Sequence, residues 1–329
     1  MFHEFGLSAS WTAAAGMPDS ERPHVRARYH RHDLNFQFRW NPASFYDLVG
    51  PTKTSRKGYG TELSWHRTLL RDLPRTMEWT VDASHWGALD RLPDHQNIST
   101  GPGFDQLFSL GTGIRYKNLR TSMGAPDFVK GVETWGAGRE DGVRSGFAGD
   151  AKWRGHPFVD GGVSVGRPIP GLRNSSLWLR TSAGYSPGDP DDAFANFYFG
   201  AFGNNWVDHQ EPKRYREPYS FPGMPIDAVA GTDYAHAVLD WNLPALRFRR
   251  AGTLALYASW VRVSFFTGAL ATELGDTARR RKLTDVGGQA DIRLQLLTQS
   301  QLTLSLGFAE AMERGRPSSH EWMVSLKIL

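Results

Sequence analysis

The stretch "DIRLQLLTQSQLTLSLGF", residues 291–308, decides the fold class. Apolar and polar side chains alternate on both sides of residues 297–300, with Ile292 and Leu294 before them and Leu304 and Leu306 after them. Alternation with a period of two is typical of a β-strand whose two faces meet different surroundings. The short connection leaves room only for a turn, so the stretch predicts an antiparallel β-hairpin.

The same alternation recurs along the chain, and no segment has helical periodicity over three turns. We therefore predict a single all-β domain spanning residues 1–329, with roughly twelve to fourteen antiparallel strands. The runs that carry this prediction are 59–69, 77–83, 108–116, 177–185, 235–243, 253–267, 292–296, 301–308 and 322–328.

The connections between these runs are of two kinds. Residues 72–75 and 297–300 are short, whereas 41–58, 87–103, 203–231 and 274–287 are long and rich in Gly and Pro. Short turns at one rim and long loops at the other are typical of a transmembrane β-barrel. The runs also reach the length that a tilted membrane-spanning strand needs. Aromatic residues near their ends match the interfacial girdles of such barrels: Trp40, Phe45, Tyr46, Trp86, Tyr116, Tyr185 and Trp241.

The run "GTLALYASWVRVSFFTGALA", residues 252–271, tests the alternative of a transmembrane helix. Arg262 is its single charge and lies near the middle, where it would cost roughly 2.5–3.5 kcal/mol in a helix. Val, Phe, Tyr, Trp and Thr favour a strand. We predict one long strand with a bulge near Phe265 and Phe266, where the alternation slips.

Composition excludes several classes of function. The chain has no cysteine, which excludes disulfide frameworks, thiol catalysis and cysteine-ligated zinc. The net charge is +4, but Lys and Arg are scattered, so no nucleic-acid partner is expected. The densest cluster, residues 279–282, is interpreted as a solvated loop, with lipid phosphate as the alternative partner.

Two motifs suggest chemistry on first inspection. "GVSVG", residues 162–166, matches the G-x-S-x-G nucleophile elbow at Ser164, but an elbow needs a helix next, and Arg167-Pro168 follows. His30 and His32 share a strand face and could reach one metal ion, yet Arg31 lies between them and no partner cluster is evident. We predict no catalytic residue, metal site or cofactor, and not an enzyme.

The connection "YREPYSFPGMP", residues 215–225, is too long and too aromatic for a hairpin turn. We interpret it as a loop that folds from the rim into the barrel lumen. Its aromatic side chains would anchor it, Pro222-Gly223 would reverse the chain, and its charged side chains, with that of Arg214, would meet opposite charges on the lumen wall. The predicted site residues are Tyr215, Arg216, Glu217, Tyr219, Phe221, Pro222 and Gly223.

The segment from "NFYFGAFG" (196–203) through "SFPGM" (220–224) to "VLDWNLP" (238–244) carries a resemblance to a known family. It resembles the C-terminal barrel of the bacterial surface antigen (Omp85-like) superfamily, as appended to TolB-like or WD40-like propeller proteins. The resemblance covers residues 175–329 best, including the closing run "EWMVSLKIL" (321–329). It implies a Gram-negative outer-membrane location, insertion by the barrel-assembly machinery, outer-membrane lipid as surroundings and a periplasmic propeller domain or partner.

Departures from the family pattern qualify this expectation. Pro222 stands where the family's turn carries a functional arginine, and the chain ends in Leu329 rather than an aromatic residue. Neither a signal peptide nor periplasmic repeats precede the barrel, so we expect a piece of a longer protein.

From these features we expect an outer-membrane β-barrel that serves as an anchor or a porin-like pore for a periplasmic module. The alternatives are a transport pore for polypeptide, lipid or small solutes, and a soluble β-sandwich binding module or Ser164-dependent hydrolase.

Overall fold

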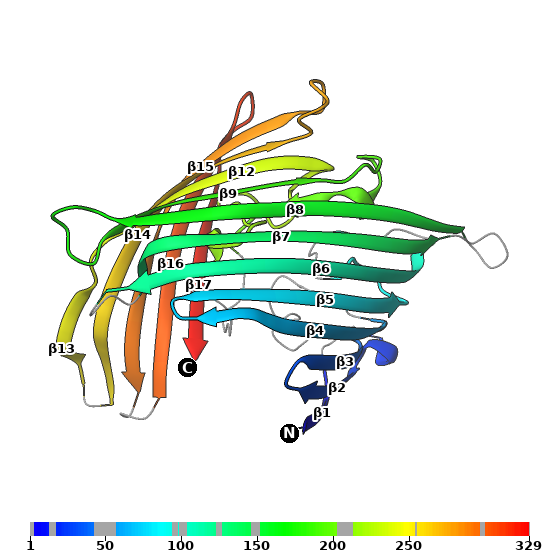
Figure 1. Ribbon diagram of the computed structural model, residues 1–329, viewed down its shortest axis with the longest axis horizontal. Helices are drawn as coiled ribbons and strands as arrows, with labels where there is room; N and C mark the ends of the chain where they lie inside the picture. The colour runs from blue at the N-terminus through cyan, green and yellow to red at the C-terminus, as the bar shows by residue number, and fades with distance from the viewer. Residues whose placement is uncertain are drawn as a thin grey trace.

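One curved antiparallel sheet makes up most of the molecule, seen in a computed structural model (Figure 1). The structure describes residues 3–12, 18–42, 57–93, 98, 104–122, 127–145, 152–202, 213–253, 255–296 and 300–328. No α-helix occurs in these ranges, which hold only three short 3₁₀ helices: η1 (Asp19–Glu21), η2 (Ala193–Ala195) and η3 (Arg214–Arg216). The prediction of an all-β antiparallel fold is therefore confirmed.

The main sheet has 15 strands, of which 14 follow one another along a single path from β1 to β17. The first nine are β1 (His3–Trp11), β2 (Pro23–Arg31), β3 (Leu34–Trp40), β4 (Tyr59–Asp72), β5 (Arg75–Gly87), β6 (Phe104–Thr121), β7 (Phe128–Ser145), β8 (Lys152–Pro168) and β9 (Ser176–Tyr185). The others are β12 (Asp233–Asn242), β13 (Leu246–Gly252), β14 (Leu256–Thr272), β15 (Arg281–Leu296), β16 (Ser300–Glu313) and β17 (Ser319–Ile328).

The strand that lies off the path, β13, explains why the sheet exceeds the expected twelve to fourteen strands. Both β12 and β13 pair with β14, through Asn242 opposite Ser264 and Leu246 opposite Val261. The Leu243 N–H still donates to the Val263 carbonyl at 3.0 Å. Pro244 then interrupts the ladder because it has no N–H to donate. β12 and β13 thus form one long strand that is broken at a proline.

The run 252–271 departs from the expectation in two places. Most of the run is one long strand, as predicted, but this strand, β14, begins only at Leu256, and Gly252 belongs to β13. The bulge lies between Ala258 and Trp260, where the register shifts, and not near Phe265 and Phe266. Phe265 is exposed and Phe266 is buried, which is strict alternation. The apparent slip in the sequence arises because both faces take an aromatic residue here.

The connections follow the predicted asymmetry between rims. All four connections longer than ten residues (12–22, 41–58, 88–103 and 186–232) lie at one end of the strands, here called the long-connection rim. The connections 32–33, 73–74, 122–127, 169–175, 253–255 and 297–299 lie at the other end, the short-connection rim. The β14–β15 loop is only 273–280, shorter than the expected 274–287, because β15 already begins at Arg281.

The two faces of the sheet differ in what they carry: buried polar and aromatic side chains lie on the concave face, and exposed apolar side chains lie on the convex face. On β12, Asp240 and Asn242 are buried on the concave face, whereas Leu239 and Trp241 point outward and are 41% and 38% exposed. The same holds on other strands. Exposed apolar residues on the convex face include Phe36, Leu63, Trp79, Ile114, Val132, Val163, Leu177, Phe265, Leu306, Phe308 and Val324.

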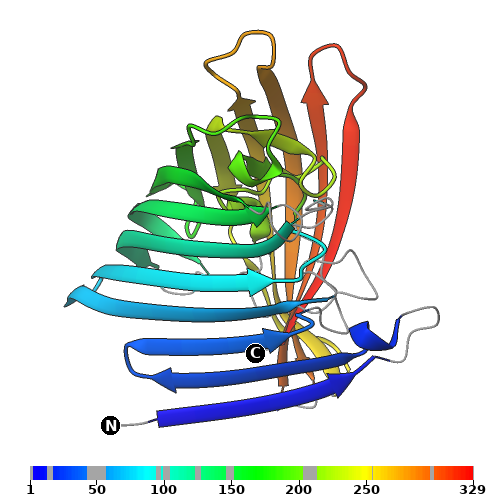
Figure 2. The ribbon, with the colours of Figure 1, turned by 90° about the vertical axis from the view of Figure 1, so that its right-hand side faces the viewer.

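The sheet curls around a segment of its own chain, of which residues 186–202 and 213–232 are described (Figure 2). β9 and β12 are hydrogen-bonded directly to one another, so this inner segment leaves the sheet after Tyr185 and returns to it at Asp233. It contains the small two-stranded sheet of β10 (Phe197–Phe199) and β11 (Val229–Gly231). No pairing between β1 and β17 occurs in the described residues.

Candidate functional site

The inner segment is fixed to the concave face by buried aromatic residues. Phe199 and Phe221 are fully buried, and both belong to one apolar cluster with Tyr234 of β12 and Leu270 of β14. Tyr215 is buried as well, and its ring stacks on Phe266 with 4.2 Å between centroids and 14° between planes. Aromatic side chains bury the largest areas of any residue type, so these contacts hold the segment in place.

Arg216 joins the inner segment to the sheet through charge. Its Nε donates to Asp240 Oδ2 at 2.8 Å, and its Nη1 donates to Asp127 Oδ2 at 2.7 Å. Nη2 donates to Asn242 Oδ1 at 2.8 Å. Tyr215 reinforces the junction, since its hydroxyl donates to Asp240 Oδ1 at 2.9 Å. Residues from three separate parts of the chain therefore meet at one guanidinium.

Further buried charges surround this junction. Arg262 donates to Asp291 Oδ2 at 2.8 Å and lies 3.4 Å from Asp127 Oδ2. Arg180 lies 3.9 Å from Asp240 Oδ2. The Lys213 Nζ donates to Asn242 Oδ1 at 2.5 Å and also to the Ser264 hydroxyl.

The pKa shifts at this cluster have clear physical causes. Burial, followed by the charges of Arg216 and Arg262, lowers the pKa of Lys213 well below its usual value. Burial would raise the pKa of Asp127, but Arg216, Arg262 and Lys213 outweigh it and hold that pKa below its usual range. Around Lys213, three arginines face three aspartates, so the buried and partly buried charges of these six residues are paired. The cluster consists of Arg180, Arg216, Arg262, Asp127, Asp240 and Asp291.

The remaining predicted residues lie farther along the inner segment. Glu217 is exposed, and Tyr219 is partly exposed with its hydroxyl bonded to Asp160 of β8. Residues 221–224 form a tight turn closed by Met224 N–H to Phe221 carbonyl at 3.4 Å, with Pro222 and Gly223 in its centre. Gly223 has φ +92°, and its N–H donates to Glu321 Oε2 at 3.1 Å. The side chain of Arg214 lies outside the described residues.

The sequence did not predict most of the charged residues that surround Arg216. Lys213, Asp127 and Asp291 come from a loop, a turn and a strand that are far apart in the chain. One signal was available, because Arg262 stood out as the single charge in an apolar run. Its partner Asp291 occupies the facing position on β15, and strand register cannot be read from the sequence.

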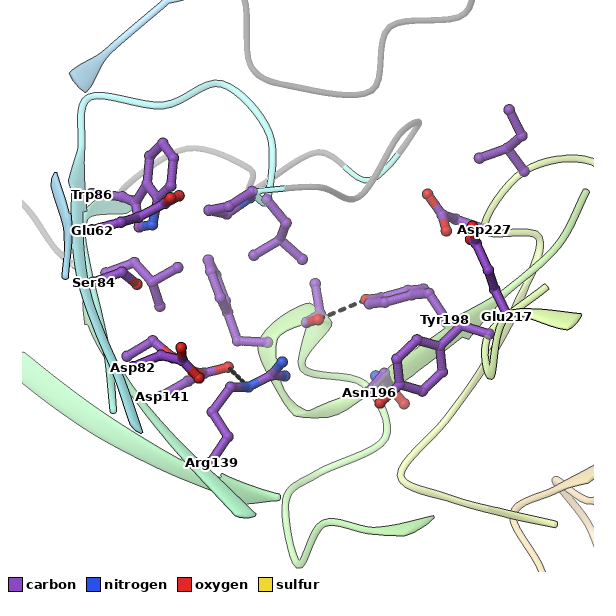
Figure 3. A pocket seen from close by; sticks show the side chains of 18 of the residues that line it. Glu62, Asp82, Ser84, Trp86, Arg139, Asp141, Asn196, Tyr198, Glu217 and Asp227 are labelled. Atoms are coloured by element: carbon purple, nitrogen blue, oxygen red, sulfur yellow. Dashed lines mark hydrogen bonds and ion pairs between the residues drawn. The ribbon is translucent and has the colours of Figure 1, made fainter. Parts of the chain in front are cut away.

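A cavity of about 740 Å³ separates the inner segment from the opposite wall of the sheet (Figure 3). Asp82 and Asp141 line it from β5 and β7, and Glu217 and Asp227 line it from the inner segment. Arg139 on the same wall is paired with Asp141 at 2.9 Å. Burial raises the pKa of Asp227 to about 7, and its Oδ2 has no hydrogen-bond partner. Acidic side chains in the lining therefore outnumber the basic ones, Arg39 and Arg139, which are paired with Glu62 and Asp141.

The two motifs of the sequence do not form sites. Ser164 lies inside β8, which continues to Pro168, so the strand-to-helix turn of a nucleophile elbow is missing there. His30 is the penultimate residue of β2 and His32 lies in the following turn, and both are exposed. Within the described ranges no group of His, Asp and Glu has a geometry that could hold a metal ion.

No protein-family model matches the chain, and no curated protein matches it. None of the helices in the described residues is long and apolar enough to cross a membrane.

Proposed function

We propose that this chain is a bacterial outer-membrane β-barrel that anchors a periplasmic module or partner to the membrane. The observation that carries the proposal is the inverted polarity of the sheet. Leu306 and Phe265 are exposed on the convex face, whereas Asp240, Asp291 and Arg262 are buried on the concave face. Apolar residues turned toward lipid and polar residues turned toward the lumen are the mark of a membrane barrel.

The strand count supports the proposal that the sheet closes into a barrel. The path holds 14 strands, an even number, so β1 and β17 run antiparallel and both have a free edge. Single-chain bacterial barrels have even strand numbers. We propose that β1 pairs with β17 in the membrane, because an open edge in lipid would leave backbone groups without hydrogen-bond partners.

An anchoring role is favoured by the inner segment. It fills part of the concave side with buried aromatic residues such as Phe199 and Phe221, which narrows any passage through the barrel. The resemblance to the Omp85-like superfamily adds the expectation of an attached propeller. Pro222 occupies the family's arginine position, while in this chain it is Arg216 that forms the ion pair with the sheet.

The proposal is tested by expression without and with detergent. We expect insoluble protein without detergent, and after refolding in micelles we expect gel migration that changes on heating. A soluble, monodisperse monomer in the absence of detergent would contradict a membrane barrel.

A transport pore is the second candidate, and the acidic cavity favours it. Asp82 and Asp227 face the cavity from opposite walls, and acidic rings select for cations in channels. Single-channel conductance in planar bilayers separates the two candidates. A pore should conduct more when residues 215–225 are deleted, whereas an inert anchor whose lumen stays closed should conduct in neither form.

A further inference from the structure

Three cations form a row on the convex face at the short-connection rim. Arg120 of β6 lies directly opposite Lys130 of β7 in the strand register. Gly131 of β7 lies opposite Gly166 of β8. Because these strands are antiparallel, the next position in this register places Lys130 beside Arg167. All three side chains are exposed. Neighbouring strands lie about 4.8 Å apart, so one ligand can contact two of these side chains at once.

The stretches of chain that carry the row, residues 118–132 and 161–188, supply no negative charge to it. Like charges directly opposite each other on adjacent strands are destabilising. Asp127 is the only acidic residue in 118–132, and it points to the concave side, where it pairs with Arg216 and Arg262. Residues 161–188 contain no Asp or Glu at all. Within the described part of the chain, no ion pair involves any member of the row.

The row lies at the edge of the apolar convex face. Val132 on β7 and Val165 on β8 follow toward the middle of the sheet and are exposed, and Leu177 of β9 is the exposed partner of Arg167. Lipid phosphates lie where the hydrocarbon region of a bilayer ends. Guanidinium groups bind phosphate through paired hydrogen bonds. Charge and position therefore match a lipid headgroup.

We propose that Arg120, Lys130 and Arg167 bind the phosphate groups of anionic phospholipids in the leaflet at the short-connection rim. This rests on the proposed membrane location of the convex face. The bound headgroup neutralises the repulsion between Arg120 and Lys130, so the lipid stabilises the β6–β7–β8 wall as well as occupying it.

The test compares the triple variant R120Q/K130Q/R167Q with the control R279Q/R314Q/R316Q, which removes the same charge at the long-connection rim. Each protein is refolded in zwitterionic micelles and titrated with phosphatidylglycerol, with phosphatidylcholine and with inorganic phosphate. We expect phosphatidylglycerol to raise the Tm of the wild type and the control. In R120Q/K130Q/R167Q the apparent affinity for phosphatidylglycerol should fall on the order of a hundredfold.

Two results overturn the proposal and separate it from the proposed function. The lipid site is refuted if R120Q/K130Q/R167Q responds to phosphatidylglycerol as the wild type does. It is also refuted if the wild type responds equally to phosphatidylcholine or to inorganic phosphate. Either result would leave the proposed membrane barrel standing. Failure of the wild type to insert into phosphatidylcholine vesicles would refute the proposed membrane barrel, and the lipid site would be refuted with it.

Discussion

Arg216 and Asp240 form a buried ion pair between the inner segment and β12, with Nε and Nη2 of the arginine 2.8 and 2.7 Å from the same carboxylate oxygen. Asp240 is fully buried, and its second oxygen accepts a hydrogen bond from Tyr215. Two consecutive residues of the inner segment are thus bound to a single carboxylate on the sheet. The carboxylate of Asp240 therefore fixes the position of this part of the inner segment on the sheet.

Replacing Arg216 with Gln should destabilise the fold strongly. The change leaves the buried Asp240 and the partly buried Asp127 without their main cation, and breaking a buried pair from one side costs about 3–5 kcal/mol. Denaturant unfolding in micelles measures the loss. R279Q is the control, because Arg279 and Asp191 form a solvent-exposed pair, and such pairs contribute little to stability. Equal losses in the two variants would refute the role given to Arg216.

Gly223→Ala should be more harmful than Gly171→Ala. Both glycines have positive φ, +92° and +82°, so each alanine carries a backbone strain of roughly 1–2 kcal/mol. Only at Gly223 would the new Cβ lie 2.6 Å from a backbone atom, the Ala311 nitrogen, whereas Gly171 has open space. The overlap should add about 1–3 kcal/mol in the same unfolding measurement. Similar losses would show that the turn does not pack closely against β16.

The pH dependence of stability should carry a contribution from Asp227. Its pKa is raised to about 7 by burial, against about 3.9 in an unfolded chain. The neutral form is therefore favoured in the folded state, and stability is lost as the pH rises from about 4 through 7.

Asp227→Asn should remove this loss, so that its Tm changes less than that of the wild type between these pH values. Asn also tolerates the positive φ of +55° at this position. Parallel Tm profiles for the two proteins would exclude Asp227 as the source.

Arginine substitutions on β16 should report the environment of the convex face. Leu306 lies at the middle of the strand and Met312 near its end, and both are exposed on the same face. In a bilayer, Leu306→Arg should cost roughly 2–4 kcal/mol and Met312→Arg about 0–1. Unfolding from lipid vesicles measures both values. Two small and equal costs would indicate that water, not lipid, covers this face.

The alternation of apolar and polar residues predicted the strands well, because it can be recognised from residues that are neighbours in the sequence. The hairpin around 297–300 has the expected form, with β15 and β16 paired antiparallel from Leu283 opposite Glu313 to Leu296 opposite Ser300. The alternation pattern predicted a bulge wrongly at Phe265 and Phe266, because these two aromatic residues face opposite sides of the sheet. Phe266 is buried because Tyr215 and Phe202, both distant in the chain, pack against its ring.

The amino-acid sequence by itself determined the all-β fold, the long strands and the uneven connections, since each depends on local periodicity and turn residues. It also marked residues 215–225 as unusual. Only the tertiary structure decided that Arg216 meets Asp127 and Asp240, and that Arg120, Lys130 and Arg167 stand in one row. Those relationships depend on the register between strands and on the path of the inner segment, and both are set by long-range packing.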